Sequence, residues 1–140
     1  MQNSTTPKLK EFAVRLLAYE TDSSKSVGLN QSAVFRLCEK LRVPLCKLMG
    51  IAGYRTLFSR ALGLAGGEVR WLRGLHVRSD GTLEGVDELE ARLVPEQITQ
   101  GELVLVARLL GLLVTFIGPA LTLQLVEEAW PGTGLEEMTL

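Results

Sequence analysis

The sequence predicts an all-α fold, a compact bundle of four to six helices with a small β-hairpin near residues 75–85. Three observations support this. Leucine occupies 27 of the 140 positions and aromatic residues make up only 6%, a composition that favours an aliphatic helical core over a β-sandwich. Apolar residues recur at helical spacing along most of the chain. A single Asp-Gly pair between two short alternating segments predicts the hairpin.

The length fits a single helical domain over residues 1–140, which is enough chain to build one hydrophobic core. Residues 1–6 and 132–140 are polar or acidic ends that we expect to be flexible.

The first helix is expected over residues 7–20. Thr6 followed by Pro7 resembles an N-cap with proline at the first helical position. The polar stretch 21–29 then predicts a flexible link. The apolar side of this helix is formed by Leu9, Phe12, Ala13, Leu16 and Leu17.

A second apolar stripe continues past residue 30 and contains Pro44. Proline removes a backbone donor and clashes with the preceding turn. We therefore expect either a kink there, or one helix that ends near Arg42 and another that begins at Pro44. This region is expected to run to about Leu64 and to stop at Gly66-Gly67, a typical C-terminal signal.

The hairpin is expected where segments 76–78 and 82–84 flank Ser79-Asp80-Gly81. Asp87 with Glu90 resembles a capping box and predicts a short helix that ends before Pro95.

The last helix is expected to begin at a second capping box, formed by Thr99 and Glu102, and to run to about Trp130. Gly118-Pro119 predicts a kink within it.

Residues 109–126 carry no charge over eighteen positions, which is the lower limit for a membrane-spanning helix. The Gly-Pro pair in mid-segment, the polar Thr115, Thr122 and Gln124, and the acidic flank argue against spanning. We therefore expect a buried central helix of a soluble bundle, and membrane association is the less favoured alternative.

The residues available for chemistry are few. His76 is the single histidine, and Cys38 and Cys46 both lie on an apolar helical stripe, where thiols are usually inert. The cysteines are eight residues apart, about 12 Å along a helix and too far for a disulfide. The sequence thus predicts no catalytic site, no metal and no cofactor, and the protein is expected to be non-enzymatic. The polar N-terminus without a signal-peptide core favours the cytoplasm.

Charge is distributed unevenly along the chain. Residues 1–70 carry a net charge of +6 and residues 71–140 carry −7, although the whole chain is near neutral at −1. This polarity can be neutralised within one fold, can orient head-to-tail association, or can attract an acidic partner to the basic half.

The leading functional hypothesis is a non-catalytic helical protein–protein interaction or regulatory module that self-associates into a homo-oligomer. A mean hydropathy of +0.20 is high for a small soluble chain and predicts apolar surface that a partner covers. The candidate interface residues are Val104, Val106, Leu110, Leu113 and Ile117.

The alternative is a nucleic-acid-binding regulator. Segment 37–62 has the outline of a helix-turn-helix, with the turn near Val43-Pro44. The candidate phosphate contacts are Arg42, Lys47, Arg55 and Arg60. A membrane-associated sensor fragment is a second alternative.

Overall fold

The computed structural model of the chain describes residues 7–27 and 33–131. The ends expected to be flexible, 1–6 and 132–140, lie outside the described residues, as do the predicted cap at Thr6 and the end of the link predicted at 21–29.

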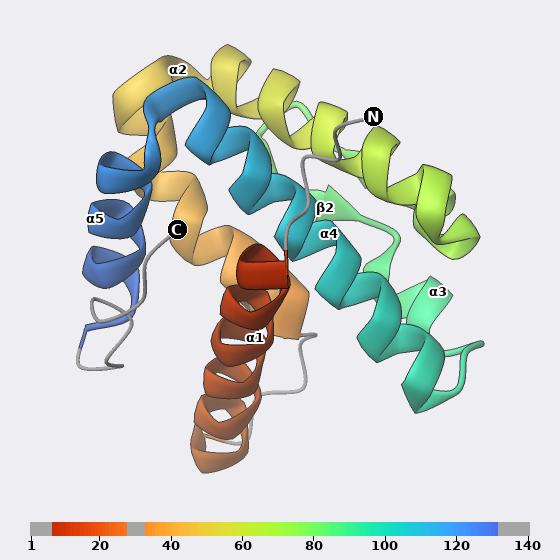
Figure 1. Cartoon of the computed structure of the whole chain (residues 1–140). Coiled ribbons are helices and arrows are strands. Elements are labelled where there is room, and N and C mark those ends of the chain that lie inside the picture. Colours follow the sequence, from red (N-terminus) through yellow and green to blue (C-terminus); the bar gives the residue numbers. More distant parts are fainter. Residues whose placement is uncertain (1–6, 28–32, 132–140) are drawn as a thin grey trace.

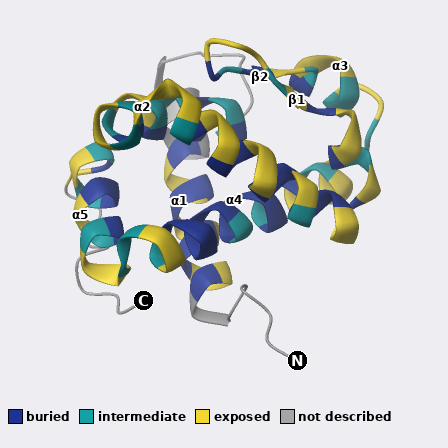
Figure 2. Cartoon of the chain, turned by 90° about the horizontal axis from the view of Figure 1, so that it is seen from above, coloured by how far each residue is buried: buried dark blue, intermediate teal, exposed yellow. Residues whose placement is uncertain are grey.

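The prediction of an all-α fold with a small hairpin is confirmed. The elements in chain order are α1 (Pro7–Val27), α2 (Ala33–Glu68), η1 (Arg70–Gly74), β1 (His76–Val77), β2 (Leu83–Glu84), α3 (Val86–Glu90), α4 (Pro95–Ile117) and α5 (Pro119–Ala129). Helix α4 lies at the centre and packs against α1, α2 and α5 (Figure 1). Buried residues extend along most of α4 (Figure 2).

Helix α1 is longer than predicted. Its apolar side is buried as expected, but the helix continues through 21–27, where the sequence predicted a link. The polar residues of that stretch have modest helix propensity, yet they include no glycine or proline that would stop the helix before Gly28.

Helix α2 bends at Gly50 and not at Pro44, so the predicted break near Arg42 and Pro44 is wrong. Gly50 has φ 79° and ψ 165°, a backbone conformation that is essentially restricted to glycine. The bend divides α2 into a first arm, before Gly50, and a second arm, after it. Pro44 is accommodated inside the first arm, where it deprives one carbonyl of its helical donor. The buried Tyr54 of the second arm connects the two, because its hydroxyl donates to the carbonyl of Cys38 in the first arm at 3.4 Å.

The hairpin forms as predicted, with His76 opposite Glu84 and Val77 opposite Leu83 in an antiparallel pair. Its turn is closed by Asp80, whose Oδ1 accepts hydrogen bonds from the amide (3.0 Å) and the hydroxyl (2.7 Å) of Thr82. These bonds lower the pKa of the Asp80 carboxyl.

The short helix α3 is present before Pro95, but Gly85 and not Asp87 is its N-cap residue. Helix α4 then begins at Pro95, so the predicted start at a Thr99–Glu102 capping box is wrong, and both residues lie within the helix. Proline suits the first helical position because its missing N–H would have no helical partner there.

Trp71 of η1 covers the first turns of α4. Its indole Nε1 donates to the carbonyl of Gln97 at 3.0 Å. A Cβ atom on Gly101 would lie 2.3 Å from Cζ2 of the Trp71 ring. Gly101 is therefore the residue that lets this ring lie against the helix.

The kink predicted at Gly118-Pro119 is a full break between two helices. Gly118 has φ 85° and ψ 160°, and Pro119 begins α5, which turns back along the bundle (Figure 1). Helix α4 is the one described helix that is long and apolar enough to cross a membrane, and 67% of its most apolar window is buried within the fold.

Candidate functional site

Four of the five predicted interface residues are in the core, so the prediction that they form an exposed contact surface is wrong for them. Val104, Val106, Leu110 and Leu113 are buried by the other helices. The reason is that α4 is the central helix and is enclosed on most sides. Ile117, at the end of α4, is only partly buried.

Ile117 contributes instead to an apolar surface groove, which we call the corner groove. It has a volume of about 500 Å³ and lies where the second arm of α2 meets the end of α4. Its wall includes the exposed Phe116, with 62% of its surface accessible. The groove is lined by Met49, Ala52, Gly53, Thr56, Leu57, Arg60, Phe116 and Ile117.

Two glycines of the same unusual conformation each directly follow a residue that lines this groove. Gly50 follows Met49 at the bend of α2, and Gly118 follows Ile117 at the end of α4. Both have φ near +80° and ψ near 160°. Nothing lies within 4 Å of a Cβ atom built on either glycine, so the backbone conformation alone requires glycine there.

The walls of the groove offer almost no hydrogen-bonding groups. The hydroxyl of Thr56 donates to the carbonyl of Ala52 at 3.0 Å, so this side chain already has an acceptor in its own helix. Arg60 is the one charged residue in the lining. The groove is therefore suited to an apolar ligand surface.

The groove has two basic side chains at one wall, Arg55 and Arg60, in a part of the chain that contains no acidic residue. Segments 40–67 and 103–126 supply all its lining residues, and neither contains an Asp or Glu. Lys47, Arg55 and Arg60 are exposed, and we find no ion pair between them and any described residue. Arg60 in the lining and Arg55 beside it give the groove a basic rim. Lys47 lies outside this rim, because it lines a separate pocket together with Glu128.

The fourth predicted phosphate contact, Arg42, is engaged elsewhere. Its guanidinium Nη2 lies 2.9 Å from Oε1 of Glu39, one turn earlier in α2. This ion pair raises the pKa of Arg42. Moreover, the helix continues unbroken through Val43-Pro44, so the turn that a helix-turn-helix requires is absent at the predicted position.

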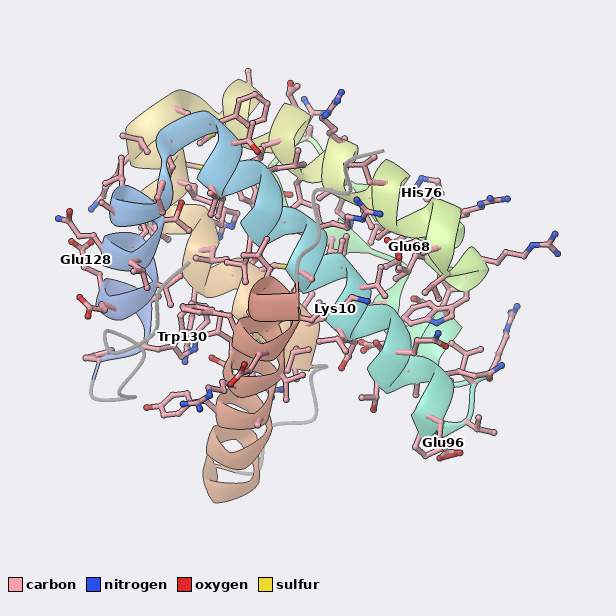
Figure 3. All side chains as sticks on the ribbon, viewed as in Figure 1. Lys10, Glu68, His76, Glu96, Glu128 and Trp130 are labelled. Carbon is pink, nitrogen blue, oxygen red and sulfur yellow. The ribbon has the colours of Figure 1, made fainter. Side chains whose placement is uncertain are left out.

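A buried charged cluster, which sequence reasoning missed, lies at the opposite end of α2. Glu20 of α1 is only 1% exposed. Its Oε2 accepts from Nε of Arg36 at 3.3 Å, and its backbone carbonyl accepts from Nη2 at 2.9 Å. Its Oε1 lies 2.5 Å from Nζ of Lys40 and accepts from Nε1 of Trp130 at 2.7 Å. Trp130, at the end of α5, is thus held against α1 (Figure 3).

The cluster joins three helices and is fully engaged. The ammonium group of Lys40 also lies over the rings of Tyr19 and Trp130, 5.9 Å and 5.6 Å from their centroids. A buried carboxylate is retained in proteins only when it is paired in this manner. In the sequence, Glu20 is visible only as a glutamate at the end of an apolar stripe. This position does not reveal that its partner is Trp130, 110 residues further along the chain.

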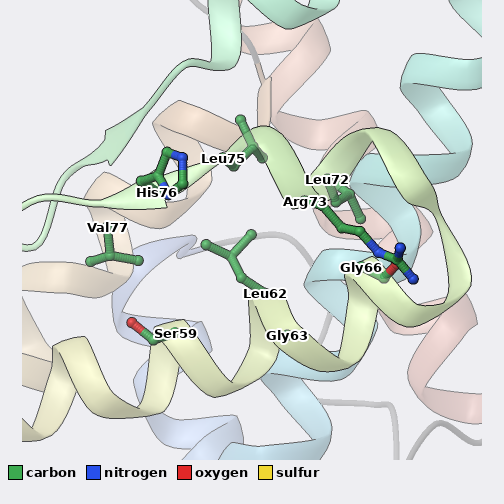
Figure 4. Close-up of a pocket in the computed structure, with 9 residues that line it drawn as sticks. All are labelled: Ser59, Leu62, Gly63, Gly66, Leu72, Arg73, Leu75, His76 and Val77. Atoms are coloured by element: carbon green, nitrogen blue, oxygen red, sulfur yellow. The ribbon is translucent and has the colours of Figure 1, made fainter.

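A second pocket, of about 330 Å³, lies between the end of α2 and β1 (Figure 4). Ser59 and His76 face it from opposite walls, and no hydrogen bond joins them among the bonds of the described residues. Arg73 is held at its edge, because its Nε donates to the carbonyl of Gly66 at 2.9 Å. Ser59 and His76 therefore do not form the hydrogen-bonded pair of nucleophile and base that covalent catalysis requires.

The thiols differ in exposure. Both are free; Cys38 is buried and Cys46 is half-buried. Burial raises the pKa of the Cys38 thiol, which keeps it protonated and unreactive. Within residues 7–27 and 33–131, no group of three His, Cys, Asp or Glu side chains is arranged to hold a metal ion.

Fold and site together define a helical domain with a central helix, α4, and an open apolar groove among the described residues. The chain matches no protein family model, no curated protein and no solved structure.

Proposed function

We propose that this chain is a non-catalytic helical interaction module, and that the corner groove receives a helix of a partner protein. The observation that carries the proposal is the exposed Phe116 beside a groove of about 500 Å³ with almost entirely apolar walls. Contiguous apolar surface of this kind on a folded chain typically marks an interaction site, and a partner helix in an apolar groove is a recurrent mode of recognition.

The shape of the groove favours a helix over a small molecule. Small ligands usually bury 70–90% of their surface in an enclosed pocket that offers a few fixed polar groups. Here the groove is a surface feature with one arginine in its lining and a strongly exposed phenylalanine in its wall. A helix can cover such a groove with its own backbone and polar face.

Charge argues against the symmetric self-association that the sequence suggested. A twofold contact brings the same patch of both copies together. At this groove it would bring Arg55 and Arg60 of both copies into one interface whose lining residues include no carboxylate to neutralise them, which is unfavourable. A partner of different sequence is therefore the occupant that the groove suits best.

The proposal can be tested by site-specific photo-crosslinking. The photoreactive analogue benzoylphenylalanine replaces Phe116 in cells that make the protein, and the adduct is identified by mass spectrometry. The identified protein is then purified, and its affinity for the chain is measured by calorimetry. We expect Phe116→Glu to weaken binding by about tenfold or more, the effect of losing a central interface residue.

Val14 provides the matched control, because it is an apolar residue that is 50% exposed on α1 and does not line the groove. We expect no specific adduct at position 14, and Val14→Glu should leave the affinity unchanged. Equal crosslinking at both positions, or binding that survives Phe116→Glu, would refute the proposal.

Nucleic-acid binding is a second candidate, favoured by the unpaired, exposed Lys47, Arg55 and Arg60 on an acid-free stretch. Such binding should weaken steeply as salt rises, because neutralised phosphates release counterions. A mobility-shift assay at low salt with mixed duplex DNA and RNA tests it. The absence of any shift would eliminate this candidate.

A further inference from the structure

We infer that the partner segment bound by the corner groove is an acidic amphipathic helix, with an apolar face that fills the groove and Asp or Glu side chains that pair with its basic rim. This inference rests on the proposed function and adds the chemistry of the partner. It follows from three properties of the groove: its length, its floor and the charge around it.

The length fits a short helical segment. After the bend at Gly50, the lining residues of α2 run from Ala52 to Arg60, which corresponds to about 12 Å, or just over two helical turns. Phe116 and Ile117 form the facing wall from α4. A guest helix of three to four turns placed between the two walls can bury residues at i, i+3, i+4 and i+7.

The floor selects an apolar face on the guest. Thr56 already bonds within its own helix, and the remaining floor residues are aliphatic or glycine. A Cβ atom at Gly53 would approach the side chain of Met49 to 3.2 Å. A polar guest side chain would lose water there, and the one polar side chain of the floor, Thr56, has only acceptor capacity left to offer it.

The rim selects acidic flanks. Arg60 lines the groove, and Arg55 lies three residues after the groove residue Ala52, on the adjacent side of the same helix. No Asp or Glu occurs between residues 40 and 67. Cations without acidic neighbours raise the local concentration of an anionic partner and repel a basic one.

The test uses three fluorescein-labelled stapled peptides of about 18 residues, long enough to be helical when stapled. They share one apolar face of Leu and Phe and differ only in the flanking residues, which are Glu, Gln or Lys. At an ionic strength of about 50 mM, where surface charges are weakly screened, we expect the Glu peptide to bind at least about tenfold more tightly than the Gln peptide. The Lys peptide should bind most weakly, and the differences should shrink at high salt.

A charge exchange makes the test specific. In the variant Arg55→Glu with Arg60→Glu, the preference should reverse, so that the Lys peptide binds more tightly than the Glu peptide. The matched control is Arg70→Glu with Arg92→Glu, two exposed arginines outside the groove. This control makes the same change in net charge and should retain the preference for the Glu peptide. Circular dichroism confirms that each variant is folded.

The outcomes separate this inference from the proposed function. Equal binding of the Glu and Gln peptides, lost in Phe116→Glu, would overturn the acidic partner but support the groove as a helix site. Failure of all three peptides would overturn the inference, whereas the crosslinking experiment decides the proposed function independently. The chain could instead co-sediment with vesicles of phosphatidylserine and phosphatidylcholine in a manner that depends on Phe116, Arg55 and Arg60. This result would show that the groove and its rim bind a lipid surface, and it would overturn the inference of an acidic helix.

Discussion

In the first arm of α2, Arg36 and Lys40 surround the carboxylate of Glu20, which is 1% exposed and satisfied by three partners. Around the bend of the same helix, Phe116 is 62% exposed, and the corner groove has no cover among the described residues. One region thus buries charge, and the other exposes apolar surface. Each reverses the usual distribution of residue types.

The two regions differ in what their side chains contact: those of the Glu20 cluster bind one another, and Phe116 of the corner groove faces solvent. The Glu20 cluster fixes the relative positions of α1, α2 and α5, because its bonds form only in one arrangement of these helices. None of these bonds involves a residue that lines the corner groove, and we propose that the exposed Phe116 is available for a partner. The predictions below test the contrast between a closed region and an open one.

The largest contrast is expected in thiol reactivity. Cys38 lies between Arg36 and Lys40 in the closed region, and Cys46 lies one turn before Gly50. Reaction of Cys38 requires global unfolding, so it should be slower than that of Cys46 by about a thousandfold or more. Kinetics with Ellman's reagent measure this, and the Cys46→Ser variant identifies the fast phase. Equal rates would show that the first arm opens locally.

Removal of the buried carboxylate charge should have the largest effect among the substitutions. Glu20→Gln removes the carboxylate charge that pairs with the buried Arg36, which we expect to reduce the free energy of unfolding by about 3–5 kcal/mol. Urea denaturation measures the change. Glu11→Gln is the control: Glu11 pairs with Arg15 at the surface, and its loss should cost less than about 1 kcal/mol. Similar losses for both would contradict a structural role for the cluster.

Stability should fall at alkaline pH. Burial raises the pKa values of Cys38 and Tyr54 in the folded chain. Above their unfolded pKa values the unfolded chain releases these protons and the folded chain does not. Unfolding is therefore favoured as pH rises, by about 1.4 kcal/mol per pH unit for each group. Urea titrations between pH 8 and pH 11 measure the slope, which Tyr54→Phe should reduce above pH 10. An unchanged slope would contradict this assignment.

The two corner glycines should tolerate no side chain. Gly50→Ala and Gly118→Ala each force a backbone conformation that costs about 1–3 kcal/mol, although both sites have open space. The control is Gly63→Ala in the straight part of α2, which also has open space and should stabilise the helix by up to about 1 kcal/mol. Thermal unfolding distinguishes the opposite signs.

The smallest effect on folding is expected in the groove itself. Phe116→Glu should change the free energy of unfolding by less than about 0.5 kcal/mol, because an exposed side chain loses little packing. Urea denaturation measures this beside Glu20→Gln. A loss of several kcal/mol would show that Phe116 belongs to the core and would remove the basis of the proposed groove.

The sequence predicted the helices and the hairpin well where local signals were strong. The stripe of Leu9, Phe12 and Leu16 and the Asp80-Gly81 turn both depend on residues that are near one another in the chain. Predicted helix boundaries were less accurate. Proline disrupts a helix wherever it stands in the interior, so the sequence predicts a break at Pro44. A glycine such as Gly50 is compatible with a straight helix and with a bend, and the sequence does not distinguish the two.

The candidate site shows the same limit. The apolar spacing of residues 103–117 was correctly interpreted as a helix face, but four of its five predicted contact residues are buried. Burial depends on which faces of α4 are covered by α1, α2 and α5, and periodicity does not contain that information. Lys47, Arg55 and Arg60, three of the four candidate phosphate contacts, are exposed, and their contact with phosphate stays a prediction.

The sequence by itself determined the helical class, the hairpin and the uneven distribution of charge, since these follow from composition and from neighbours within about one helical turn. Tertiary structure alone decided which apolar residues are covered, that Glu20 meets Trp130, and that the bends at Gly50 and Gly118 lie at one corner. The physical reason is that side-chain exposure and ion pairing depend on distances between helices, which packing of the whole chain sets.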